Sequence, residues 1–225
     1  MLEIVYQDDH LIAINKPHGL LVHRSSIASD AKEFALQLLR DQVGRFVSPV
    51  HRLDRKTSGL LLFAFDKEVE IAMHQQFQNG EVQKKYLAIL RGHAPDQLDI
   101  DYPLLKENGN MQEAFTSFVT LKRAELDIAF GKHQTSRYSL VEASPTTGRM
   151  HQLRRHFAHI FYPIIGDRKH GCNKQNKFFK EQWEMTTMLL HASELAFIHP
   201  VTKQQVQLSA GVQSEFLRVM ALMNW

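Results

Sequence analysis

The chain has 225 residues, of which 44% are hydrophobic and 23% charged, and this length and composition are those of a globular protein with one sizeable domain or at most two small ones. No apolar run approaches the ~20 residues that span a bilayer, and the N-terminus lacks a secretory signal pattern. The single cysteine, Cys172, excludes an internal disulfide or a thiolate zinc cluster, so a cytoplasmic protein is expected; the net charge of +3 by itself indicates no particular partner.

The predicted elements follow from apolar periodicity and from turn and cap residues. In chain order they are strands at residues 2–6 and 11–15, a helix at 30–39 capped by Ser29 or Asp30, a strand at 60–65, a helix capped by Asp66 that ends near Gly80, and a strand at 86–90. A polar loop is expected at 106–112, then a strand at 138–142, a helix at 151–160, strands at 189–197 and 206–208, and a helix at 215–223.

These elements mix strands and helices without a strict βαβ alternation, and no repeat or linker divides the chain. They predict an α+β fold with a mixed, mostly antiparallel central sheet flanked by helices and loops. In the helix at 151–160, Leu153, Phe157 and Ile160 share one face. Residues 1–225 are expected to form a single domain.

The segment from His51 to Leu60 places one carboxylate, Asp54, among four basic residues just ahead of the strand at 60–65. Neighbouring cations favour the ionised form of an acid. An ionised aspartate on a loop held by a rigid strand can act as a nucleophile or a base. A surface salt bridge at the start of a strand is the alternative interpretation.

A second segment, from Thr147 to His156, contains Arg154 at the edge of a buried helical face. An arginine turned ~100° from Leu153 can keep its charge while partly buried, and it can bind a carboxylate or phosphate through two donors. An amphipathic helix with a basic outer face is the alternative. Two basic clusters either follow a phosphate backbone or form solvated surface: Arg149, Arg154 and Arg155, and then Arg168, Lys169, Lys174, Lys177 and Lys180.

A third segment ends in Lys85-Tyr86, where Tyr86 could stack on a base or could be an ordinary half-buried strand residue. The combination and order of the three segments are specific. His51-Arg52-Leu53-Asp54 with Thr57-Ser58-Gly59-Leu60, then Lys85-Tyr86, then Gly148-Arg149-x-His151-Gln152-Leu153-Arg154 resemble the large pseudouridine synthase family, which modifies ribosomal and transfer RNA. The opening motif Asp8-x-x-Leu11-x-x-x-Asn15-Lys16-Pro17-x-Gly19 also matches that family.

The resemblance implies one catalytic domain over residues 1–225, with no separate N-terminal RNA-binding domain. Further segments are similar to the family member that modifies uridine 65 in the T-arm stem of tRNA: Leu21-Val22-His23-Arg24-Ser25, the doubled arginine at 154 and 155, and residues 163–171. The stretch between Leu105 and Tyr138 is shorter than expected for that member. A target in ribosomal RNA or at another tRNA position is therefore the alternative.

The resemblance also implies the chemistry. The bond from ribose C1′ to uracil N1 breaks, the base rotates, and C1′ is rejoined to C5, without a cofactor or a metal. Asp54 is then the catalytic carboxylate, either as nucleophile or by removing a ribose proton. Two further catalytic residues are implied: Arg154 pairs with Asp54 and keeps it ionised, and Tyr86 packs against the uracil and is a candidate for a proton transfer. Arg52 fills the gap left by the flipped uridine, Leu153 lines the pocket, and His51 and Arg149 contribute to substrate binding.

Three other classes of protein would account for parts of this pattern. A metal enzyme would use His151, His156 and His159, but their spacing does not place all three on one helical face. A hydrolase would use Ser58 or Thr57 near His51, but the Gly-x-Ser-x-Gly turn is absent. A non-catalytic RNA-binding module would keep the basic clusters without needing Asp54. The expected partner is RNA, foremost tRNA, with no membrane and no obligate protein partner; a monomer is expected.

Overall fold

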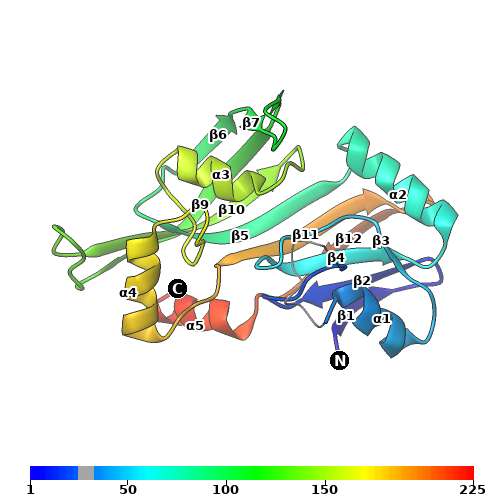
Figure 1. Cartoon of the computed structure of the whole chain (residues 1–225), viewed down its shortest axis with the longest axis horizontal. Helices are drawn as coiled ribbons and strands as arrows, with labels where there is room; N and C mark the ends of the chain where they lie inside the picture. The colour runs from blue at the N-terminus through cyan, green and yellow to red at the C-terminus, as the bar shows by residue number, and fades with distance from the viewer. Residues whose placement is uncertain (25–32) are drawn as a thin grey trace. The chain divides into compact units, whose positions relative to one another are not determined.

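The computed structural model describes residues 1–24 and 33–225, which form two compact units (Figure 1). Unit 1 comprises Met1–Lys84 and His191–Val212, and unit 2 comprises Lys85–Leu190 and Gln213–Trp225. Each unit combines antiparallel strands with helices, which confirms the predicted α+β class. The helix caps expected at Ser29 and Asp30 lie outside the described residues.

The sheet of unit 1 contains two fully buried strands. The strands are β1 (Glu3–Gln7), β2 (Leu11–Lys16), β4 (Ser58–Ala64) and β11 (Leu190–Ile198) in that order, with β12 (Gln205–Ser209) paired to β11 and β3 (Ser48–Pro49) paired to β4. The pairing is antiparallel except between β4 and β11, which run parallel. Both β2 and β4 are buried along their whole length, which explains the unbroken apolar run at 60–65.

The parallel pair depends on Gly59. In the register of β4 and β11, Gly59 lies opposite Ala192. A Cβ atom at Gly59 would lie 2.2 Å from the carbonyl oxygen of Ala192, and the φ of Gly59 is +106°. Glycine alone fits both conditions, since it has no Cβ and adopts positive φ without steric cost.

The two helices of unit 1 begin in different ways. Asp66 caps α2 (Lys67–Asn79) by accepting from the amide of Val69 at 2.8 Å, as predicted, and Gly80 ends the helix in the left-handed conformation. Helix α1 (Ala35–Val43) begins five residues later than expected, because Phe34 is extended. The first free amides of α1 donate instead to the carbonyls of Leu21 and Val22, so the helix needs no side-chain cap.

The sheet of unit 2 is antiparallel, in the order β5 (Gln83–Arg91), β10 (Ser136–Pro145), β9 (Phe115–Leu126) and β6 (Gln97–Asp101). A short hairpin pairs β7 (Leu104–Leu105) with β8 (Met111–Gln112). The polar loop expected at 106–112 is therefore shorter, since its last two residues are a strand and the amide of Lys106 closes the turn on the carbonyl of Asn110. Strands β6 and β9 were not predicted.

Three helices complete unit 2: α3 (Gln152–His159), α4 (Asn173–Trp183) and α5 (Ser214–Leu222). Helix α3 lies across β10 (Figure 1) and buries Leu153 and Phe157 in a core cluster with Leu90 and Val141, while Ile160 packs at its edge. The predicted apolar face of this helix is therefore confirmed. Helix α4, which contains Lys174, Lys177 and Lys180 of the second basic cluster, was not predicted.

Candidate active site

The loop that carries Asp54 is anchored on both sides of the carboxylate. Leu53 and Thr57 are buried, with 7% and 3% of their surface exposed, whereas Asp54 is half-buried. The amide of Thr57 donates to the carbonyl oxygen of Asp54 at 3.1 Å, which closes a turn directly before β4. The backbone around Asp54 is thus fixed while its side chain stays near the surface.

The buried side chain of Lys16 forms hydrogen bonds with the backbone of this loop. Its ammonium group is buried and donates to the carbonyl oxygens of Pro17, Leu20 and Arg55 at 2.9, 2.9 and 3.3 Å. Burial lowers the pKa of Lys16 to about 7, while the charge of Asp54 acts in the opposite direction. Lys16 therefore ties the end of β2 to the Asp54 loop. The sequence motif contained Lys16, but it was not among the expected site residues.

His51 is held against β4 and α2. Its Nε2 atom accepts from the amide of Leu62 at 3.0 Å, and its ring stacks on Phe77 with the ring centres 4.8 Å apart. Burial lowers the pKa of His51 to about 3, helped by the charge of Lys84, so the ring is neutral and free to accept at Nε2. This geometry makes His51 a support of the loop. The neighbouring Arg52 is exposed.

In unit 2, Arg154 forms a buried, two-pronged ion pair with Asp167. Nε and Nη2 of Arg154 donate to the two carboxylate oxygens of Asp167 at 2.7 and 2.9 Å. Asp167 also accepts from the amides of Lys169 and His170. Burial raises the pKa of Asp167, but the hydrogen bonds and charge of Arg154 more than offset this and hold the pKa below its usual value. Asp167 thus fixes the guanidinium of Arg154.

The start of α3 is fixed by Gln152. Its side-chain oxygen accepts from the Thr147 hydroxyl and the Arg149 amide, and its nitrogen donates to the Phe115 carbonyl and the Thr116 hydroxyl, all at 2.6 to 3.0 Å. These bonds join the turn before α3 to β9. The side chain of Gln152, through these four hydrogen bonds, therefore sets the direction of the helix that carries Leu153 and Arg154.

The remaining expected residues of unit 2 occupy three different environments. Leu153 is buried in the core cluster, and the half-buried Tyr86 packs against the same cluster. Arg149 is exposed, and its Nε donates to the carbonyl of Glu113 at 2.9 Å. Tyr86 and Leu153 thus share one core of unit 2, while Arg154 is buried in its ion pair with Asp167 and Arg149 lies on the surface.

The expected residues fall into two groups by unit. Unit 1 holds His51, Arg52 and Asp54, and unit 2 holds Tyr86, Arg149, Leu153 and Arg154. The pairing of Arg154 with Asp54 stays a prediction. The partner found for Arg154 within unit 2 is Asp167, which the sequence offered in the segment at 163–171 but which was not recognised as a site residue.

Ser58, the nucleophile of the hydrolase alternative, is buried. Its hydroxyl contacts Nδ1 of His191 at 2.9 Å, and Nε2 of His191 lies 3.1 Å from the carbonyl of Ala210. Since a carbonyl accepts only, Nε2 carries the proton and Ser58 donates to Nδ1. With 5% of Ser58 and none of His191 exposed, this pair holds β4 against β11.

The three histidines of the metal-enzyme alternative have separate partners. His151 bonds to His170, His156 lies between Thr116 and the carbonyl of Tyr102, and the ring of His159 stacks on that of Tyr102. In the described part of the chain, no three His, Cys, Asp or Glu side chains are grouped so that they could hold a metal ion. Nor does any described helix have the length and apolar character needed to cross a membrane.

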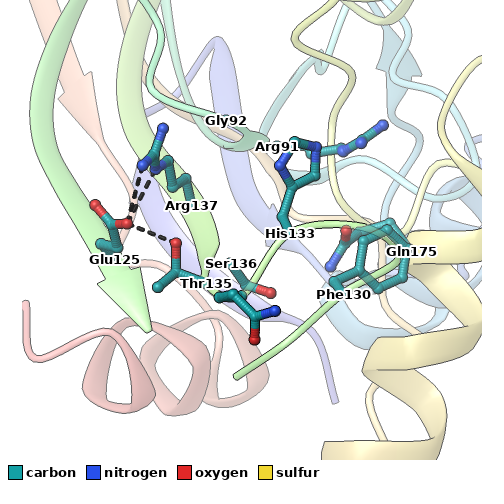
Figure 2. A pocket seen from close by; sticks show the side chains of 10 residues that line it. Arg91, Gly92, Glu125, Phe130, His133, Thr135, Ser136, Arg137 and Gln175 are labelled. Atoms are coloured by element: carbon teal, nitrogen blue, oxygen red, sulfur yellow. Dashed lines mark hydrogen bonds and ion pairs between the residues drawn. The ribbon is translucent and has the colours of Figure 1, made fainter. Parts of the chain in front are cut away.

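Two hollows in unit 2 lie apart from the expected residues. One, of about 450 Å³, is lined from β5, the β9–β10 hairpin and α4; Figure 2 shows its Glu125 bonded to both Arg137 and Thr135. The other, of about 230 Å³, contains Arg168, Lys177 and Lys180 of the second basic cluster. None of the seven expected site residues lines either hollow, so neither is assigned to the catalytic site.

The Asp54 loop and the α3 segment with its buried arginine both lie within the part of the chain that matches a known family. Residues 10–159 match the model of the RNA pseudouridylate synthase family, and the chain belongs to this family. This confirms the resemblance found in the sequence.

Particular relatives are more informative still. The chain is 45% identical over 235 residues to the tRNA pseudouridine synthase C of Pasteurella multocida, covering 100% of this chain and 97% of that protein. It is 44% identical over 236 residues to the tRNA pseudouridine synthase C of Vibrio cholerae, again covering 100% and 97%. Among solved structures, the human RNA pseudouridylate synthase domain containing 4 aligns with a TM-score of 0.74 and 25% identity, covering 99% of this chain and 93% of that one.

Proposed function

We propose that this enzyme isomerises a uridine of tRNA to pseudouridine, at position 65 in the T-arm stem. The supporting observation is the full-length similarity to proteins named tRNA pseudouridine synthase C, at 45% and 44% identity. The same similarity favours tRNA over ribosomal RNA as the substrate. A binding module without activity would not need a buried lysine, Lys16, to hold the loop that carries the half-buried Asp54.

Asp54 is the catalytic carboxylate in this proposal. It acts on the ribose, while the detached uracil is held beside the sugar so that recombination is effectively unimolecular. The C1′–N1 bond breaks, the C1′–C5 bond forms, C5 loses its proton and N1 gains one. These changes balance without an oxidant or a transferred group, so no cofactor is required. Lys16 and His51 position the loop, and Arg154, held by Asp167, provides a fixed cation.

The other expected residues contact the substrate. Tyr86 packs against the uracil and Leu153 lines the pocket; the exposed Arg52 stacks in the gap left by the flipped uridine, and the exposed Arg149 binds the RNA backbone. We propose that both units belong to one catalytic domain, since the family match runs without interruption through residues of both. We propose a cytoplasmic monomer without an obligate protein partner, which light scattering of the purified protein tests.

The test uses a tRNA transcript carrying tritium at uracil C5. Wild-type protein is expected to release tritium to water, because C5 exchanges its proton for the bond to C1′. Asp54→Asn is expected to abolish the release while tRNA binding persists. Asp9→Asn is the matched control, because Asp9 is an exposed aspartate of the same unit.

The outcomes separate the alternatives. Sequencing of the product tests position 65. Release from ribosomal RNA but not from tRNA would keep the chemistry and change the substrate. A folded protein that binds RNA but releases nothing from either would contradict the enzymatic proposal. Unchanged release by Asp54→Asn would remove Asp54 from the reaction.

A further inference from the structure

Phe161, just beyond the end of α3, combines two unfavourable features. Its side chain is almost fully in water, with 88% of the residue's surface exposed. Its φ is 66°, in the left-handed region that bulky residues rarely adopt. The other non-glycine residues with positive φ in the described chain are His151, Glu184, Lys203 and Asn224. Phe161 is therefore the apolar exception among polar residues.

The backbone hydrogen bonds at this position explain the left-handed conformation of residue 161 but not why the residue is a phenylalanine. The amide of Phe161 donates to the carbonyl of Ala158 at 3.1 Å, and the amide of Tyr162 donates to that of Phe157 at 2.9 Å. Such bonds end a helix through one left-handed residue, for which glycine is preferred. Glycine would relieve the backbone and would expose no ring to water. The fold alone thus disfavours phenylalanine here.

The surroundings suit a nucleic acid. Residues 143–166 contain three arginines and neither Asp nor Glu; Asp167 neutralises Arg154, so the positive charge of this segment comes from the exposed Arg149 and the half-buried Arg155. Two residues before it, the ring of His159 stacks on that of Tyr102 with centres 3.6 Å apart. Exposed rings interleaved with cations are typical of surfaces on which unpaired bases stack.

We propose that Phe161 is a stacking residue for a base of the substrate RNA, other than the reacting uridine. Phe161 lies beyond the end of α3 and is exposed, whereas Arg154 is buried in its ion pair with Asp167, so the two side chains occupy different environments. The inference rests on the proposed function in that its ligand is the RNA substrate. The stacking stabilises the complex with RNA and offsets the free energy that Phe161 costs the folded chain.

The experiment compares Phe161→Gly, Phe161→Trp and the control Leu217→Ala, which removes another exposed apolar side chain of unit 2, on α5. Thermal unfolding, filter binding of tRNA and the kinetics of tritium release are measured for each. Phe161→Gly is expected to melt at the same temperature as wild type or higher. It is also expected to bind tRNA about 5-fold to 100-fold more weakly, in the range of one base–aromatic stack.

Further readouts separate stacking from other roles. In the kinetics of tritium release, Phe161→Gly is expected to raise KM and to change kcat much less. Phe161→Trp is expected to keep tRNA affinity, and its added fluorescence is expected to be quenched by tRNA. Leu217→Ala is expected to bind tRNA as wild type does.

Three results would overturn the proposal. Unchanged tRNA affinity in Phe161→Gly would show that no base stacks there. A lower melting temperature in that variant would assign the ring to folding. Equal loss of tRNA affinity in Phe161→Trp and Phe161→Gly would point to a shape-specific contact instead of stacking. Failure of the proposed function is seen separately, because it concerns tritium release by the wild type, whereas this test compares affinities for RNA.

Discussion

At the scale of single residues, the proposed site depends on buried groups that hold its backbone and its charged side chains in place. The ammonium group of Lys16 donates hydrogen bonds to three backbone carbonyls around the Asp54 loop. Asp167 is 1% exposed and receives two side-chain and two backbone donors. Their role is orientation, because a buried group with saturated hydrogen bonds has only one low-energy position.

Asp167→Asn tests this role. The variant loses the charge and one acceptor of the bidentate pair with Arg154, and charge-assisted hydrogen bonds are worth about 1.5–3 kcal/mol. We expect urea unfolding to show a loss of that size and tritium release to fall in kcat more than in KM. The exposed Asp99→Asn on β6 serves as control. A variant with wild-type kcat would show that Arg154 needs no fixing by Asp167.

At the scale of elements, α2 is the helix whose start is most clearly determined by one side chain. Asp66 accepts from the amide of Val69 at 2.8 Å. We expect Asp66→Ala to lower the free energy of unfolding by about 1 kcal/mol, and Asp66→Asn, which keeps an acceptor, to lower it by much less. Urea titrations of both variants measure the difference. Equal losses in the two would mean that the charge of Asp66, and not its cap, stabilises the helix.

Elements with clear local signals were predicted, and those determined by distant contacts were not. The first hairpin, β4, α2 and α5 follow from periodicity and caps. Strand β9 was missed because its exposed positions carry Lys122, Arg123 and Glu125, which conceal the alternation. The start of α1 depends on carbonyls at residues 21 and 22, more than ten positions away, which no local pattern reveals.

The same distinction applies to the candidate site. Asp54, Tyr86 and Arg154 stand out because their segments have a family-specific order, which the family match supports. Asp167 and Lys16 act by forming hydrogen bonds with Arg154 and with the Asp54 loop, and these contacts are visible only in the folded structure. Phe161 carried no signal at all in the sequence, because its unusual feature is a backbone angle.

At the scale of the whole molecule, stability is expected to fall steeply in mild acid. Burial lowers the pKa of five histidines: to about 4 for His18, to about 3 for His51, to about 4 for His170, and in the same direction for His156 and His191. Between pH 6.5 and about 4 the unfolded chain therefore binds more protons than the folded one. The stability that these histidines contribute by staying neutral in the folded chain is fully present above pH 6.5 and is lost as the pH falls.

The measurement is the free energy of unfolding in urea at pH 7, 6 and 5. Since several histidines contribute, we expect the slope between pH 6 and 5 to exceed the about 1.4 kcal/mol per pH unit of one proton. His51→Gln, which removes one of the five, is expected to have a shallower slope. A flat profile from pH 7 to pH 5 would contradict the lowered pKa values.

Unit 1 is assembled from two segments that are more than 100 residues apart in the sequence, and this constrains the order in which the enzyme can fold during synthesis. Its strand β4 pairs with β11, more than 120 residues later, and Ser58 bonds to His191 across that pair. While the first 190 residues emerge, β4 lacks this neighbour. The strand that follows the Asp54 loop gains its parallel neighbour only after His191–Val212 has been synthesised, so catalytic competence is expected to arise only once that segment is available.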